Sequence, residues 1–184
     1  MPAPQPGLTS RARWIIHTQL AAFSSRRKHT PGIHTRATGY IPFTRPARDS
    51  LAAAWREAGG LGSGHWSTGH LLLGLMAQDD GVAARSLNRI GISVDQVRSH
   101  GREITAGPQH GTSPLSRPAG GVIPAVLAEA AARCDERIGT RHLLLALYRA
   151  DDQGAAQVLD TLGARESEVR AAIDAVLAET APEE

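Results

Sequence analysis

The sequence predicts an all-α protein of eight helices, arranged as two pseudo-symmetric repeats of four. An octet recurs along the chain, as TGHLLLGL at 68–75 and TRHLLLAL at 140–147. At the same offset of 72, residues 42–104 and 114–176 share 21 of 63 positions, spread along the whole unit. Within each repeat the apolar residues follow helical spacing, with glycine and proline at matching places. A tandem duplication of a helical unit explains these observations.

The first helix of the first repeat is expected to begin at Thr44, whose hydroxyl can cap it, and to tolerate a proline in its opening turn. The glycines of 59–64 end this helix. Its apolar face is predicted to contain Leu51, Ala54, Trp55 and Ala58.

The second helix is capped by Ser67 or Thr68 and carries the octet. Because the octet is apolar almost all round, we expect burial on most sides and assign His70 and Leu72 to the core. A short helix then runs to about Ile90, and Gly91 ends it. The capping box of Ser93 and Gln96 starts a fourth helix, which ends near residue 104.

The second repeat predicts the same four helices, beginning near 118–124, 140, 154 and 166. Pro124 follows two glycines, so the first of these should not start before about residue 122. His142 and Leu144, which match His70 and Leu72, are likewise assigned to the core.

Residues 1–40 carry six basic residues and no acid, and their composition is typical of a flexible arm outside the fold. The expected domains are residues 41–104 for the first repeat, 105–113 for a linker and 114–180 for the second repeat. No apolar run approaches the roughly 20 residues of a membrane span. The single cysteine, Cys134, fits a reducing compartment, and we expect a cytoplasmic protein.

The paired histidines raise the question of catalysis. No acid lies near either one in sequence to orient it, and no H-x-x-x-H spacing offers a zinc site. The glycine-rich run at 59–69 lacks the GK[ST] ending of a phosphate loop. We therefore expect no catalytic residue, metal or cofactor, and no enzyme.

The stretches FTRPARDSLAAAWREA and STGHLLLGLMAQDDGVAARSLNRIGIS, followed by GTRHLLLAL with DDQGAAQVLDTLG, resemble the double Clp-N motif. This motif forms the amino-terminal domain of ClpA/ClpC-type AAA+ unfoldases. The resemblance covers about residues 42–179 and implies two four-helix halves without catalytic activity of their own. Such domains recruit substrates and adaptors to the unfoldase ring. No ATPase motif follows the second repeat, so we expect a stand-alone binding module.

The resemblance also implies binding positions. The second octet position, usually glutamate in ClpC-type domains and assigned there to phosphoarginine, is occupied by Gly69 and Arg141. Since neither residue can accept a guanidinium, we expect no phosphoarginine recognition of the family kind. A peptide, adaptor or cyclic-peptide ligand is expected instead in an apolar groove, formed by Tyr40, Phe43, Thr44 and Leu115.

One alternative function remains open from the sequence. A nucleic-acid-associated regulator could use the basic residues of 1–40 for phosphate contacts. Salt-dependent DNA binding that is lost on deletion of 1–40 would favour this alternative over the binding of Clp substrates or adaptors.

Overall fold

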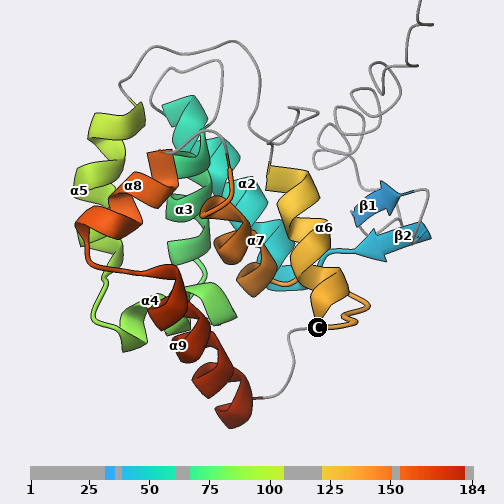
Figure 1. Cartoon of the computed structure of the whole chain (residues 1–184). Coiled ribbons are helices and arrows are strands. Elements are labelled where there is room, and N and C mark those ends of the chain that lie inside the picture. The colour runs from blue at the N-terminus through green and yellow to red at the C-terminus, as the bar shows by residue number, and fades with distance from the viewer. Residues whose placement is uncertain (1–31, 36–38, 61–66, 106–121, 151–153, 181–184) are drawn as a thin grey trace, which may run out of the picture.

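The computed structural model describes residues 32–35, 39–60, 67–105, 122–150 and 154–180. Within these residues it contains eight helices and one pair of short strands, which confirms the all-α class (Figure 1). The first repeat provides α2 (Arg45–Gly60), α3 (Thr68–Met76), α4 (Val82–Arg89) and α5 (Val94–Thr105). The second provides α6 (Val122–Ala132), α7 (Thr140–Leu147), α8 (Gly154–Thr161) and α9 (Glu166–Glu179).

The helix ends follow the local sequence signals. The Thr44 hydroxyl accepts a hydrogen bond from the N–H of Ala47, 3.4 Å away, at the start of α2. Ser93 and Gln96 form the predicted capping box of α5, with distances of 2.8 and 3.3 Å. Gly91 has a φ of 85°, the left-handed conformation expected of a C-terminal glycine.

The two octet helices, α3 and α7, lie at the centre of the core. Helix α2 packs against α3, and α6 packs against α7. The contact between α2 and α3 is close at Gly74, where an added Cβ would lie 2.7 Å from the backbone nitrogen of Ala54. The fully buried leucines of the two octets are Leu71, Leu72, Leu75, Leu143, Leu144, Leu145 and Leu147.

The two repeats pack closely against each other through helices of both units. Helix α4 of the first repeat packs against α9 of the second, and α5 packs against α8 (Figure 1). Both pairs join the third helix of one repeat to the fourth helix of the other. The apolar face of each repeat is therefore completed by the other repeat.

The structure corrects the predicted face of α2. Ala47, Leu51, Ala54 and Ala58 are buried, at the i, i+4, i+7, i+11 spacing of one helical stripe. Trp55 was predicted to join this stripe but is 58% exposed, because a residue one position after Ala54 is rotated by about 100°.

A second difference concerns the arm, since the fold begins before residue 41. The strands β1 (Gly32–Thr35) and β2 (Gly39–Pro42) pair antiparallel, with Ile33 opposite Ile41. Both isoleucines pack against the core, so burial of these β-branched side chains explains the pairing. The chain then passes close to the second repeat, where the N–H of Ile138 donates to the carbonyl of Pro42 at 2.8 Å.

Candidate functional site

The octet histidines occupy equivalent places in the first turns of α3 and α7. His70 Nδ1 accepts a hydrogen bond from the N–H of Ser67, and His142 Nδ1 accepts one from the N–H of Gly139, both at 2.9 Å. Both imidazoles are buried. Because Nδ1 accepts in each case, the ring proton lies on Nε2, and Nδ1 cannot take a proton from a substrate.

The octet threonines connect the two repeats. The hydroxyl of Thr68 accepts a hydrogen bond from the N–H of Ala155, at 3.0 Å, and that of Thr140 accepts one from Ala83, at 3.1 Å. Both acceptors are buried. Each octet therefore provides the acceptor for a backbone N–H in the first turn of the third helix of the opposite repeat.

An acidic residue orients His142, contrary to the expectation from the sequence. Asp135 Oδ2 accepts a hydrogen bond from His142 Nε2 at 2.8 Å and pairs with Arg141 Nη2 at 2.7 Å. Burial alone would raise the pKa of Asp135, but the hydrogen bonds from Arg141 and His142 bring that pKa below its usual range. Asp135 precedes His142 by seven residues, and the loop between α6 and α7 brings them together.

The two positions that the resemblance would assign to phosphoarginine are both largely buried. Gly69 lies inside the first turn of α3, and the side chain of Arg141 is only 12% exposed. Arg141 is also neutralised by Asp135, so the phosphate attraction expected of a free arginine is reduced. The first repeat has Ser63 at the place of Asp135, so the sequence provides this carboxylate in the second repeat alone.

Of the residues predicted to form the apolar groove, Tyr40 is the one that the described part of the chain exposes. Phe43 is buried in the core, and Thr44 is buried as the cap of α2. Leu115 lies outside the described residues. Tyr40 is 40% exposed, and burial raises the pKa of its hydroxyl while the charge of Arg48 acts in the opposite direction.

The outward side of α2 carries a second exposed aromatic residue, Trp55, in addition to Tyr40. Arg48 and Trp55 are seven residues apart, which places them on one side of the helix with an axial separation of about 10 Å. Tyr40 and Trp55 are the large hydrophobic side chains that the described part of the chain exposes. Together Tyr40, Arg48 and Trp55 form what we call the α2 surface. Trp55 was missed as a surface residue because its position looked apolar and helical.

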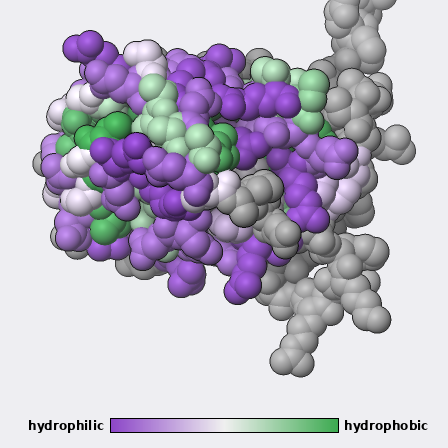
Figure 2. Space-filling model, turned by 90° about the horizontal axis from the view of Figure 1, so that it is seen from below, coloured by the Kyte–Doolittle hydropathy of each residue, from purple (hydrophilic) through white to green (hydrophobic). Residues whose placement is uncertain are grey.

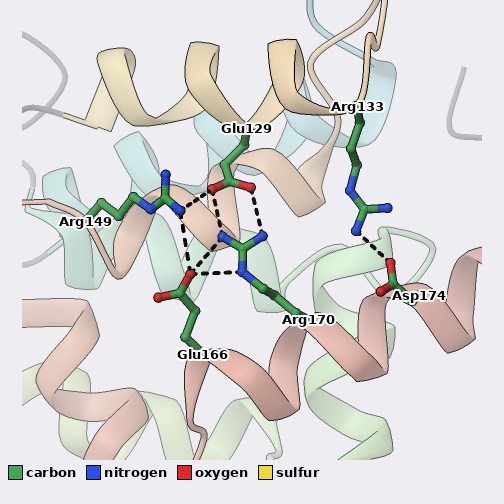
Figure 3. A network of polar contacts seen from close by, with 6 residues as sticks. All are labelled: Glu129, Arg133, Arg149, Glu166, Arg170 and Asp174. Atoms are coloured by element: carbon green, nitrogen blue, oxygen red, sulfur yellow. Dashed lines mark hydrogen bonds and ion pairs between the residues drawn. The ribbon is translucent and has the colours of Figure 1, made fainter.

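A network of charged side chains joins α6 to α9 (Figure 3). Glu129 is only 4% exposed and makes a two-point contact with Arg170, at 2.8 and 3.0 Å. Arg149 and Glu166 also belong to this network, and Arg133 pairs separately with Asp174 of α9 (Figure 3). The hydrogen bond from Arg170 is the main reason that the pKa of Glu129 lies below its ordinary value.

The first repeat contains a weaker version of this contact. Glu57 and Arg98 hold the equivalent positions, and their charged atoms are 3.8 Å apart at a partly exposed site. The recurrence of Glu57 as Glu129 and of Arg98 as Arg170 in the repeat was the available sequence signal. The network is a structural contact between helices, since both oxygens of Glu129 are occupied by arginines of the chain itself.

The described residues lack two features, a metal site and a membrane-spanning helix. No three histidine, cysteine or acidic side chains among them come together as a metal site would require. No helix among the described elements has the length and apolar character needed to span a membrane. The basic residues that precede Gly32 lie outside the described residues.

Comparison with known proteins supports one family. The model of the Clp repeat (R) N-terminal domain matches residues 42–162. The chain is 33% identical over 169 residues to the chloroplastic chaperone protein ClpC2 of Oryza sativa, covering 90% of this chain and 18% of that protein. It is 32% identical over 123 residues to the negative regulator of genetic competence ClpC/MecB of Bacillus subtilis, covering 66% and 15%.

A solved structure supports the same fold. The N-terminal domain of the chaperone ClpD from Arabidopsis thaliana superposes with a TM-score of 0.57 at 24% identity, covering 74% of this chain and 94% of that domain. The chain spans less than a fifth of the length of these curated relatives. The match of the family model to two thirds of the sequence, together with relatives above 30% identity, shows that this chain belongs to the Clp repeat (R) N-terminal domain family.

Proposed function

We propose that this chain is a non-enzymatic module that binds peptide segments of Clp substrates or adaptors, or peptide-like ligands, through the α2 surface. The observation that carries the proposal is the exposure of Tyr40 and Trp55 around Arg48 on one side of the domain. Tyrosine, tryptophan and arginine are the residues most enriched among those that dominate binding energy at protein interfaces.

The buried groups support binding over catalysis. Nδ1 of each octet histidine is occupied by a backbone N–H, and the Nε2 atom of His142 faces Asp135. A general base needs a lone pair directed at its substrate, which these rings do not present. The side chains that could have acted in catalysis therefore stabilise the fold instead.

The expected ligand is an extended peptide with apolar residues and at least one acid. The aromatic rings of Tyr40 and Trp55 offer apolar contact area, while Arg48 offers a planar donor to a carboxylate. Asp49 of the same helix faces Arg45 at 3.7 Å, so Arg48 is not its partner in that ion pair.

Fluorescence anisotropy with labelled α-casein, used as an unfolded polypeptide, tests the proposal. We expect saturable binding by the full chain and a loss of at least tenfold in affinity for Tyr40→Ser with Trp55→Ser, about 1.4 kcal/mol. Asp95→Ser, at an exposed position of α5, is the control and should bind normally. Equal binding by the double variant, with an unchanged melting temperature, would exclude the α2 surface.

A further inference from the structure

Helix α6 presents an outward side with no charge at all. Its one charged residue, Glu129, is turned inward to Arg170 and Arg149 (Figure 3). The outward side, which we call the α6 face, consists of exposed Pro124, Ala128, Ala131 and Ala132 and of half-buried Ile123 and Leu127.

The equivalent helix of the first repeat shows that this is unusual. Helix α2 carries Arg45, Arg48, Asp49 and Arg56 on its outward side, and Arg56 is the counterpart of Ala128. Figure 2 shows a mostly hydrophilic surface on the side seen from below, with hydrophobic residues limited to a few patches. An amphipathic helix normally places its charges toward water, so a charge-free outward side on α6 is a surface suited to being covered.

One segment of the chain matches the α6 face in chemistry. Residues 14–23, WIIHTQLAAF, form an apolar stretch with no acidic, lysine or arginine side chain. The arm around this segment is purely basic, whereas the residues after 40 hold 18 acidic and 14 basic side chains. The arm and the body therefore attract one another, and the apolar stretch can bury area against the α6 face.

The segment is also tethered within reach of the α6 face. Gly32 pairs with Pro42 across the two strands. The carbonyl of Pro42 accepts a hydrogen bond from the N–H of Ile138, which follows the end of α6 by six residues. The nine residues from 23 to 32 can span up to about 30 Å. Helix α6 is about 16 Å long. A tether of this length gives effective concentrations that reach the millimolar range.

We propose that residues 14–23 bind the α6 face of the same chain. The tether and the opposite charges favour this occupant over a second copy or a foreign peptide. The segment then protects an apolar surface that would otherwise be open to association.

The test follows Trp14 in the full chain with Trp55→Phe and Trp66→Phe, which leaves Trp14 as the single tryptophan. We expect a blue-shifted emission and weak quenching by acrylamide. Ala128→Glu should shift the emission to the red and raise the quenching constant several-fold. Arg56→Glu, at the equivalent position of α2, is the matched control and should leave both values unchanged.

Three results would overturn the proposal. Trp14 could be as accessible as free tryptophan in the parent protein. Both Ala128→Glu and a second variant, Ala131→Glu, could leave Trp14 shielded while circular dichroism shows an intact fold. Finally, shielding that rises with protein concentration, together with a doubled mass in light scattering, would assign the α6 face to a second copy.

Discussion

The hydroxyl of Thr140 accepts a hydrogen bond at 3.1 Å from the backbone N–H of Ala83, which lies 57 residues earlier in the chain. The equivalent bond joins Thr68 to Ala155 across the other side of the pseudo-symmetry. Because of these two contacts and the packing of α4 on α9 and of α5 on α8, we expect the two repeats to unfold as one cooperative unit.

Replacing Thr140 by valine should lower the free energy of unfolding by about 1–2 kcal/mol, because the buried N–H of Ala83 then lacks its acceptor. Urea unfolding followed by circular dichroism measures this change. Thr161→Val is the control, since its exposed hydroxyl donates only to the carbonyl of Gln157 in its own helix. Two separate unfolding transitions in either protein would contradict the single unit.

Gly74→Ala should destabilise the protein by about 3 kcal/mol, because the added methyl group would overlap the backbone of α2 at Ser50 and Ala54. Gly59→Ala should instead stabilise it by about 0.5–1 kcal/mol. Its added Cβ meets no atom within 4 Å, and alanine favours a helix over glycine. Thermal melts of the two variants show whether each melting temperature falls or rises. Equal changes in melting temperature would argue against the close contact of α2 with α3.

Glu129→Gln should cost about 2 kcal/mol near neutral pH, because Arg170 loses its two-point carboxylate contact and both arginines keep only Glu166 as an acidic partner. The folded pKa of Glu129 is depressed, so its stabilisation is fully present above the unfolded value of 4.5 and is lost as the pH falls through the folded pKa. The variant should therefore show a flatter loss of stability in acid.

Glu57→Gln is the matched control for this prediction, because Glu57 holds the same place in the first repeat. Its contact with Arg98 is longer and more exposed, so the expected cost is below about 1 kcal/mol. Urea titrations at several pH values compare the two variants. Equal slopes in acid for Glu129→Gln and the parent would disprove the assignment to Glu129.

Cys134→Gly should stabilise the fold by about 0.5–1 kcal/mol, since Cys134 has a φ of 54° and glycine adopts this conformation without strain. The first repeat already has Gly62 at the equivalent position. Cys134→Ala should bring no gain, because alanine keeps the strain of a positive φ. The melting temperatures of the two variants test this. A rise for both variants would show that loss of the thiol, and not relief of the positive φ, stabilises the fold.

Free phosphoarginine should bind weakly or not at all to the parent protein in calorimetry, because neither Gly69 nor Arg141 can accept a guanidinium. Arg141→Glu alone should not restore binding, since the new carboxylate would face Asp135 at the position where Arg141 now pairs at 2.7 Å. Adding Asp135→Ser, the residue type of the first repeat, should allow binding at the second octet. Micromolar binding by the parent would show this expectation to be wrong.

Local signals predicted the helices well because each boundary depends on a few adjacent residues. The starts at Thr140, Gly154 and Glu166 were predicted from the repeat of the first unit, and that at Val122 from the position of Pro124. Trp55 was misplaced because helical periodicity does not distinguish a stripe from its flank. Asp135 and the strand pairing at Pro42 were missed because both depend on contacts between segments distant in sequence.

The third helix of each repeat packs on the fourth helix of the other, and this bears on what a single copy of the unit could do. A single ancestral copy of the unit would expose the apolar side of its third helix and leave the N–H at the Ala83 position without the threonine hydroxyl. Such a copy could close its core only by associating with an identical chain, in a homodimer with twofold symmetry. The covalent link between the repeats makes this contact intramolecular, and each half can therefore hold residues, such as Asp135, that the other does not share.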